Sequence, residues 1–403
     1  MREEFFKKLG EAAGRLREEG GGEALIVHHD EADGLCSAAV TKRALERLGF
    51  KTETLCLDKL FPSVVERVHR GGGKTILYAD IGAFHARKIS KLNESRSLTI
   101  ILDHHDTEPV SDPTLYNLNP ELFGISGEKE ASASATAYFF AKTLSEENAD
   151  LAHLAVVGSA EIPGPPSGLN KMALEDALKR GLAKLEKSKA GWEVKISAMD
   201  PPLSWRRAST LLSVLGSVGY YRGGPEAGVS ACLEGFPEEA RKGALKLEEE
   251  RREANKRLLA ELRARGLNQL GRVQWFHAGG AFKGMGTKVV GSFCSYLSFQ
   301  RIVNPVKYLI GMMPMPKEVP GFGELKEEYV KASGRAPRRL AALINEGKKP
   351  PLSTVLAGAC EACGGFGDGH AVAASGVILK GREEEFLLKL DSLIGAGPAG
   401  RRA

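Results

Sequence analysis

Residues 76–82 read ILYADIG and residues 99–106 read TIILDHHD, and these two stretches decide the fold. Each is a short apolar run, rich in branched side chains, that ends in acidic or imidazole groups. Runs of this kind are typical of buried parallel strands. A third run, residues 23–34 (EALIVHHDEADG), ends in the same way. The sequence therefore predicts three strands whose carboxyl ends carry carboxylates and histidines to one edge of a sheet, where open α/β folds bind their ligands.

The composition is that of an ordinary globular protein. At 403 residues the chain has room for two or three domains, with 42% hydrophobic and 27% charged residues. No apolar run approaches the roughly 20 residues of a membrane span, and residues 1–20 read as a charged amphipathic helix rather than a signal peptide. We therefore expect a cytoplasmic protein with no membrane partner. The net charge of +5 permits a polyanionic partner without requiring one.

Six scattered cysteines favour reduced thiols packed in cores. Cys360 and Cys363 form a single CxxC, but a structural zinc site needs two further ligands, and none is evident nearby.

Strand and helix patterns alternate to about residue 190, which indicates a parallel sheet with helices on both faces. The predicted strands cover residues 24–28, 52–57, 75–81, 98–104 and 154–160. Residues 191–236 are rich in Gly and Pro and look irregular, and residues 237–266 predict a long charged helix. That helix is either a connector between domains or a solvated helix on one of them. A second alternating region follows over residues 271–395.

The predicted architecture is thus α/β in two parts. A parallel-sheet domain (residues 1–195) is joined by an irregular segment and helical connector (196–268) to a smaller α/β domain (269–395). We expect the tail, residues 396–403, to be disordered.

Clustered Asp, Glu and His side chains suit divalent cations such as manganese or magnesium. One carboxylate between two such ions can bridge them, and the pair can activate water for displacement at phosphorus. No GxxxxGKS or GxGxxG motif follows the first strand. Each short motif alone is weak, since a buried histidine is more often a core residue than a ligand. Three strand ends that carry acids in this order favour a functional site over a structural role, because burying a carboxylate costs free energy unless it is paired or bound to a metal.

The order HxExDG, ADIG, DHH resembles the DHH phosphoesterase superfamily. The second half extends the resemblance: residues 364–376 (GGFGDGHAVAASG) are similar to the glycine-histidine motif of the associated DHHA1 domain, and residues 329–335 (YVKASGR) to its VKVSxR strand. The resemblance covers nearly the whole chain. It is strongest to the archaeal RecJ-like nucleases, which act on single-stranded nucleic acid.

This resemblance implies a role for each matching residue. The site would bind up to two manganese or magnesium ions, and Asp80 would bridge them. Asp103 would orient a histidine ligand, and His105 would face the scissile phosphate. The implied metal ligands are Glu31, Asp33, Asp80, His104 and Glu161; the implied catalytic residues are Asp103, His104 and His105; the implied substrate contacts are Ser333, Arg335, Gly367, Gly369 and His370, with Gly364 and Gly365 beside them.

Two positions depart from the family pattern. Glu31 stands where the first motif has an aspartate, and Ile162 where the fourth motif has one, with Glu161 adjacent. An active single-strand exonuclease and a catalytically impaired scaffold subunit of the replication machinery, working beside GINS-type proteins, both fit. Hydrolysis of small oligonucleotides or cyclic dinucleotides is a third alternative, since fold alone cannot choose. Two arginine pairs, Arg206–Arg207 and Arg338–Arg339, either line a phosphate path or are solvated; solvation is favoured for the first pair.

Overall fold

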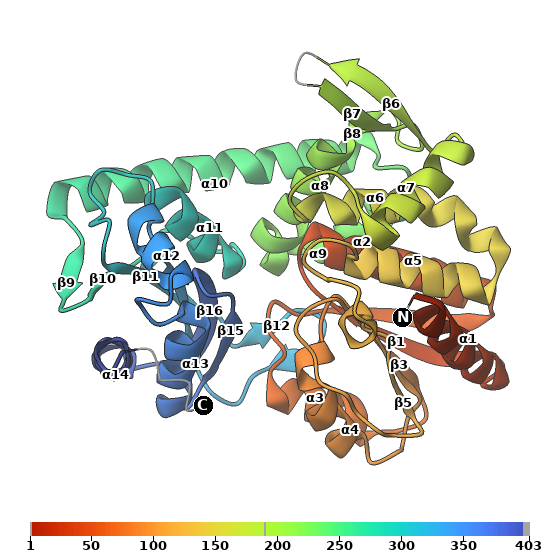
Figure 1. Cartoon of the computed structure of the whole chain (residues 1–403), viewed down its shortest axis with the longest axis horizontal. Coiled ribbons are helices and arrows are strands. Elements are labelled where there is room, and N and C mark those ends of the chain that lie inside the picture. Colours follow the sequence, from red (N-terminus) through yellow and green to blue (C-terminus); the bar gives the residue numbers. More distant parts are fainter. Residues whose placement is uncertain (1, 189–190, 398–403) are drawn as a thin grey trace. The chain divides into compact units, whose positions relative to one another are not determined.

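A computed structural model describes residues 2–188 and 191–397, and the chain forms two compact units, residues 1–247 and 248–403 (Figure 1). We describe each unit by itself. Most of the tail that the sequence predicts to be disordered, residues 398–403, lies outside the described residues.

The first unit is built on a five-stranded parallel sheet; the sequence predicts its parallel character and four of its strands, but not the strand at residues 115–117. Its strands are β1 (Gly22–His28), β2 (Phe50–Cys56), β3 (Thr75–Ala79), β4 (Thr99–Leu102) and β5 (Leu115–Asn117), in the order β2-β1-β3-β4-β5. All five residues of β3 and all four of β4 are buried. Strands buried on both faces read as continuous apolar runs, which is why the sequence identifies them.

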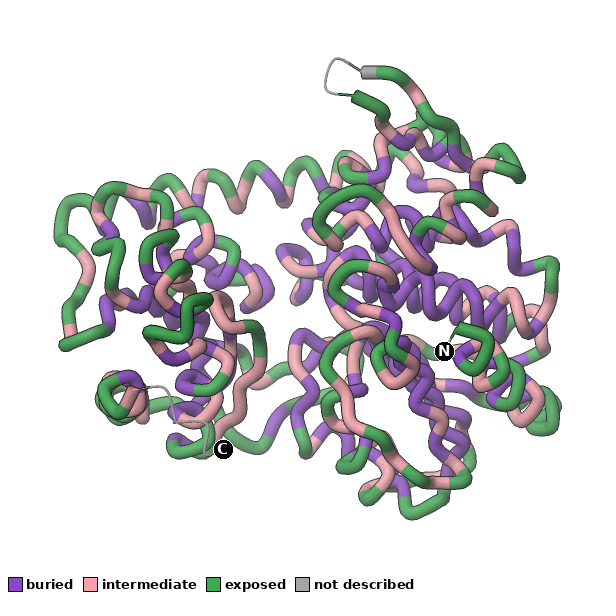
Figure 2. Tube along the Cα trace, in the orientation of Figure 1, coloured by how far each residue is buried: buried purple, intermediate pink, exposed green. Residues whose placement is uncertain are grey.

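Helices cover both faces of this sheet. The chain leaves β1 toward β2 through α2 (Ala32–Arg47), and then runs the other way through α3 (Pro62–Arg70) and α4 (Ala86–Asn93). Because such crossovers are right-handed, the reversal places α2 on one face and α3 and α4 on the other (Figure 1). The helix α5 (Ala133–Leu144) packs beside α2, and Figure 2 shows both as buried. Helix α1 (Arg2–Glu18) packs on α5.

Two regions of this unit differ from the sequence prediction. Residues 154–160, predicted as a strand, lie in helix α6 (Ala152–Gly158) and the 3-10 turn that follows. All seven residues of α6 are buried, and a short apolar run buried on every side has no periodicity that separates strand from helix. Residues 191–236, predicted to be irregular, contain regular elements: β7 (Gly191–Ile196), which pairs with β6 (Ala183–Ser188), then β8 (Leu203–Ser204), α8 (Trp205–Ser213), a π-helical turn (Val214–Val218) and α9 (Gly224–Leu233).

The predicted long charged helix is α10 (Glu238–Arg265), whose residues belong partly to each unit. In the second unit a six-stranded sheet has the order β15-β16-β14-β11-β10-β9. Its strands are β9 (Asn268–Leu270), β10 (Val273–His277), β11 (Tyr308–Met315), β14 (Tyr329–Arg335), β15 (Phe366–Gly369) and β16 (Ala373–Leu379); its helices are α11 (Lys288–Leu297), α12 (Arg338–Asn345), α13 (Leu352–Ala362) and α14 (Glu383–Gly395).

All six cysteines are buried and free, as the sequence favours. Within the described ranges, no helix has both the length and the apolar character needed to cross a membrane.

Candidate metal centre

Three neighbouring strand ends of the first unit bring the predicted polar side chains to one edge. β1 is followed by His29 and Asp30, β3 by Asp80, and β4 by Asp103. Two backbone hydrogen bonds keep these ends in register, from His29 N to Ala79 O at 3.3 Å and from Asp80 N to Leu102 O at 2.9 Å. β1 and β3 are adjacent strands from which the chain departs in opposite directions. Their carboxyl ends therefore form the topological switch point, the usual ligand position in such sheets.

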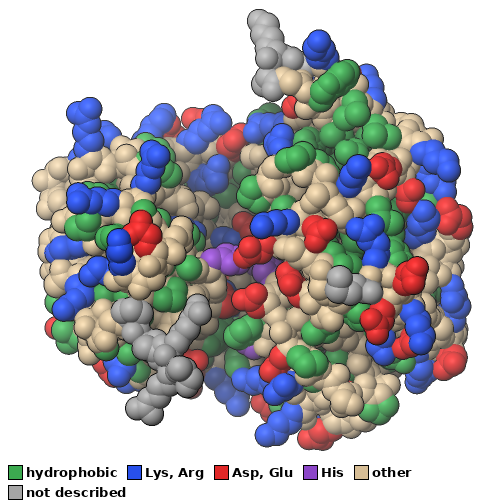
Figure 3. Space-filling view, in the orientation of Figure 1, with side chains coloured by type: hydrophobic (Ala, Val, Ile, Leu, Met, Phe, Trp, Pro, Cys, Tyr) green, Lys and Arg blue, Asp and Glu red, His purple; other side chains and the backbone are tan. Residues whose placement is uncertain are grey.

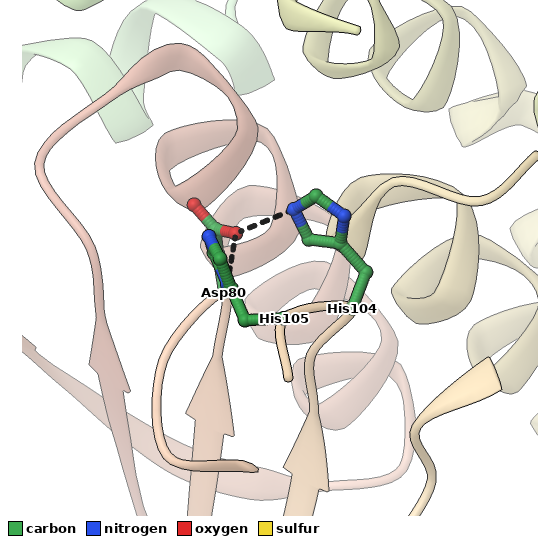
Figure 4. A group of neighbouring side chains, drawn as sticks. All are labelled: Asp80, His104 and His105. Carbon is green, nitrogen blue, oxygen red and sulfur yellow. Dashed lines mark ion pairs between the residues drawn. The ribbon is translucent and has the colours of Figure 1, made fainter. Parts of the chain in front are cut away.

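Asp80, His104 and His105 form a group of potential metal ligands, with one ligand atom from each within 4.8 Å of the others. Figure 4 shows the two imidazoles directed at the Asp80 carboxylate. Asp80 Oδ1 lies 3.5 Å from His104 Nε2 and 3.8 Å from His105 Nδ1. The other oxygen, Oδ2, lies 3.5 Å from His29 Nδ1.

This group fits a divalent cation. Asp80 is buried, and its Oδ1 accepts no hydrogen bond from any residue that the structure describes. A buried carboxylate oxygen in that state is costly unless something else satisfies it. The separations from the imidazole nitrogens exceed hydrogen-bond length, and carboxylate with imidazole is a set of donors that manganese accepts. Asp80 Oδ1 is therefore the atom on which a metal would be held.

The backbone of Asp80 is unusual, with φ at 62°. Residues other than glycine seldom adopt the left-handed region, and such residues cluster at functional sites. The left-handed turn lets the chain leave β3 with the Asp80 side chain at the sheet edge.

Both carboxylate oxygens of Asp103 accept hydrogen bonds from neighbouring residues. Its Oδ1 accepts hydrogen bonds from His105 Nδ1 at 2.7 Å and from His104 N at 2.8 Å, and its Oδ2 accepts one from Ala83 N at 2.9 Å. His104 Nδ1 lies 2.7 Å from Gly127 O, to which it donates, so its Nε2 is the nitrogen that faces Asp80. Such bonds behind a ligand select its tautomer and ring orientation.

Asp33 joins the site to two helices. It lies in the first turn of α2, and its two oxygens accept hydrogen bonds from Ala133 N at 2.9 Å and Ser134 N at 2.8 Å, at the start of α5. Its Oδ2 also lies 3.6 Å from His104 Nε2. A Cβ atom on Gly158 would come within 2.6 Å of Asp33 Oδ1. Sequence reasoning identified Asp33 but missed Ala133, Ser134 and Gly158, which carry no local signal.

Glu161 lies at the other end of this arrangement. Its Oε1 accepts hydrogen bonds from Ala32 N at 3.0 Å and from Ser213 Oγ at 2.9 Å, so it satisfies the first amide of α2. Glu31 immediately precedes that helix. Neither glutamate belongs to the group of three formed by Asp80, His104 and His105 among the described residues. Metal binding by Glu31 and Glu161 stays a prediction.

Opposed charges shift the pKa values of this cluster. Burial and the neighbouring Asp33 charge raise the pKa of Asp80 to about 6. Burial disfavours a charged His104, but Asp80 and Asp33 outweigh it and raise its pKa to about 10. The pKa of His105 is raised against burial by Asp103, whose own pKa is lowered by His105 despite burial. Asp80 and Asp33 thus favour a protonated His104, and an entering cation competes with that proton.

The predicted substrate contacts lie in the second unit. On β14, Ser333 is buried, and Arg335 donates from Nε to Ser295 Oγ and from Nη1 to the Gly334 carbonyl, both at 2.8 Å. His370 is exposed in the turn between β15 and β16, and its amide donates to Ala373 O at 2.7 Å. Ala373 pairs with Arg335 across the sheet. The structure therefore places Arg335 and the His370 turn next to each other.

The motif glycines have a packing reason of their own. A Cβ atom on Gly365 would lie 1.7 Å from Val377 O, and one on Gly369 would lie 2.5 Å from Ala374 Cα. For Gly367 the nearest atom would be a Leu356 methyl at 3.1 Å, and for Gly364 a Leu379 methyl at 2.6 Å. The close approach of neighbouring backbone thus requires glycine at positions 365 and 369, with or without a phosphate, whereas at 364 and 367 the nearest atom is a flexible leucine methyl.

Comparison with known proteins gives the class. Residues 23–159 match the model of the DHH family, N-terminal domain. A RecJ structure in complex with Mn²⁺ from Thermus thermophilus superposes on 97% of this chain and 55% of that one, with a TM-score of 0.64 and 16% identity. A CDC45 structure from Entamoeba histolytica covers 98% of each chain, with a TM-score of 0.54 and 10% identity. The fold of this chain is therefore similar to that of these two structures.

A curated relative agrees with this class. An uncharacterized protein of Methanocaldococcus jannaschii is 32% identical over 166 residues, which is 38% of this chain and 36% of the relative. The match thus spans about a third of that relative's length. Residues 23–159 are thus similar to the N-terminal domain of the DHH family, and the fold of the chain is similar to that of RecJ.

Proposed function

We propose that this protein is a manganese- or magnesium-dependent phosphodiesterase that hydrolyses single-stranded nucleic acid. The observation that carries the proposal is the buried Asp80 Oδ1, which faces two imidazoles and accepts no hydrogen bond from the described residues. Structures with this fold contain manganese, as in the Thermus thermophilus RecJ complex. When bound, the ion would stabilise negative charge at the phosphate and lower the pKa of a water molecule, so that hydroxide is available as the nucleophile.

Residues of the first unit would bind the metal and the phosphate. Asp80 and His104 would hold the metal, and Asp33 would keep His104 aimed at it. Asp103 fixes His105 through Nδ1 at 2.7 Å, which leaves the other ring nitrogen of this half-exposed histidine available to a phosphate. The Asp103 carboxylate raises the pKa of His105. In its protonated form this imidazole would donate a charge-assisted hydrogen bond to a phosphate oxygen.

The test is release of nucleotides from an end-labelled single strand with manganese present. We expect wild-type release to be abolished by chelator and by Asp80→Asn, while Glu175→Gln, on exposed surface of α7 (Gly168–Lys179), behaves as wild type. Duplex of the same sequence should be a poor substrate. Wild-type protein that releases no more than a metal-free control would refute the proposal.

A second candidate is a scaffold role without hydrolysis, beside GINS-type replication proteins. It is favoured by Ile162, which stands where the resemblance expects an acidic ligand, and by the likeness to CDC45 along the whole chain. The double variant Glu31→Asp/Ile162→Asp separates the two. If the site is catalytically impaired, the double variant should gain activity, because it restores an aspartate at both positions of the family pattern. If the site is active with Glu31 as a ligand, the double variant should lose activity, because the geometry of that ligand is changed.

A further inference from the structure

The second unit contains an open groove of about 580 Å³ that no motif of the sequence describes. It is lined by residues of two segments, 298–305 after α11 and 337–342 at the start of α12. Its lining residues include two arginines, Arg338 and Arg339, and no carboxylate. A positive groove without acidic residues favours an anionic ligand.

The two arginines are exposed and have no partner within the fold. Neither side chain makes an ion pair or hydrogen bond with any residue in the described ranges. They also occupy the first turn of α12, where the helix dipole disfavours positive charge. The other arginine pair differs: Arg206 donates to Gly164 O at 3.1 Å and lies over the Trp205 ring at 4.7 Å. Arg206 is thus used internally, whereas Arg338 and Arg339 remain available.

An aromatic side chain stands beside these charges. Phe299 is 79% exposed, the most exposed large hydrophobic residue that the structure describes, and it lines the same groove. Figure 3 shows how Lys and Arg side chains recur over the surface of the protein, so charge alone does not distinguish this place. An exposed ring next to two free guanidinium groups is the combination that binds single strands, with bases stacked on the ring and phosphates on the arginines.

The segments that line the groove are also linked to the predicted substrate contacts of the same unit. Arg335 ends β14 three residues before Arg338. Its Nε bonds Ser295, one helical turn before Phe299. The His370 turn is tied to the same place through Ala336 N to Val372 O at 2.9 Å. We propose that residues 298–305 and 337–342 extend the path of a bound single-stranded nucleic acid beyond the glycine-histidine motif. This inference rests on the substrate class of the proposed function.

The test is binding of the full chain to a fluorescein-labelled 20-nucleotide oligothymidylate in chelator, at several salt concentrations. Arg338→Gln/Arg339→Gln should weaken binding roughly tenfold and reduce the salt slope by about 1.4, at ~0.7 per single-strand phosphate contact. The matched control Lys348→Gln/Lys349→Gln removes the same charge just after α12, and its slope should stay near wild type. An equal change in both variants would make the effect one of net charge and overturn the proposal.

Phe299→Ala should weaken binding about tenfold with the salt slope unchanged, since stacking on the ring involves no counterions. Leu388→Ala, an exposed apolar residue on α14, is its control and should bind as wild type. Thermal melts confirm that each variant is folded. A polyglutamate of equal charge should compete poorly; equal competition would show an acidic-peptide site and overturn the assignment. Binding is measured in chelator and therefore does not depend on hydrolysis. Absence of nuclease activity would refute the proposed function without changing this binding result.

Discussion

Asp80 combines three features that seldom occur in one residue: a positive φ, burial, and an oxygen without a hydrogen bond from the described residues. Each alone costs free energy, on the order of 1 to 3 kcal/mol. A residue that combines these three features is a candidate ligand for a cation. The neighbouring Asp103 shows the contrary state, since its two oxygens accept hydrogen bonds from Ala83 N and His105 Nδ1.

The first prediction concerns Asp80→Asn. Asparagine tolerates the left-handed backbone, so the fold should persist, but a neutral amide is a poor ligand. Manganese affinity should fall by roughly 100-fold or more. Calorimetry measures this, and manganese should raise the melting temperature of wild type but not of the variant. Equal affinities would remove Asp80 from the metal site.

At the scale of elements, the site depends on where helices begin. An amide in the first turn of α2 donates a hydrogen bond to Glu161, and two amides in the first turn of α5 donate hydrogen bonds to Asp33. Amides at a helix start have no partner within the helix, and carboxylates stabilise them. Two helices are thereby locked to the acidic edge of the sheet.

The second prediction separates a structural role of Glu161 from a ligand role. Its Oε1 already accepts two hydrogen bonds. We expect Glu161→Gln to lower manganese affinity less than threefold, since an amide oxygen can accept the same bonds. Stability should fall by only about 0.3 to 1 kcal/mol, because the variant keeps the hydrogen bonds and loses only the negative charge at the start of α2. Calorimetry and urea unfolding measure the two quantities. A loss of affinity as large as that of Asp80→Asn would instead make Glu161 a ligand.

The third prediction compares two helical glycines. On Gly158 a Cβ atom would lie 2.2 Å from Ser134 Oγ and 2.6 Å from Asp33 Oδ1, whereas nothing lies within 4 Å of one on Gly10. Gly158→Ala should therefore destabilise the protein by about 1 to 3 kcal/mol and weaken manganese binding through Asp33. Gly10→Ala should stabilise it by about 0.5 to 1 kcal/mol, with binding unchanged. Stabilisation by both substitutions would show that α6 yields without disturbing Asp33.

At the scale of the whole molecule, acid stability depends on buried neutral histidines away from the metal. His153 donates to Asp150 O at 3.1 Å, and burial lowers its pKa to about 4. Asp150 in turn binds Arg47 on α2, at 2.9 and 2.6 Å. Protonating His153 would thus place a second positive charge in this packed region.

The fourth prediction follows from that lowered pKa. In the unfolded chain a histidine titrates near 6.5, so between pH 6.5 and about 4 the unfolded state holds a proton that native His153 lacks. Its contribution is full above pH 6.5 and is lost as the pH falls toward 4, on the order of 3 kcal/mol in all. His153→Gln keeps the donor and should flatten the curve of unfolding free energy in this window. The exposed His370→Gln should leave the curve unchanged.

The sheet could be predicted because its strands are local signals. Leu77 and Ile100 belong to apolar runs whose length alone argues for buried strands, and the polar residues after them follow in fixed order. Residues 338–345 and 352–362 in the second unit form helices that we did not predict. Both helices are short, 8 and 11 residues, and each directly follows a proline, Pro337 or Pro351, which interrupts the local pattern.

By itself the sequence determined which residues stand at the strand ends and that Asp80, His104 and His105 share one edge, because strand direction and chain order are enough to place them. Only the tertiary structure decided how each is used. Asp33 accepts a hydrogen bond from an amide 100 residues away, Glu161 accepts one from an amide 129 residues away, and Phe299 and Arg338 line the same groove. Such contacts arise from packing between distant segments, which no local pattern encodes.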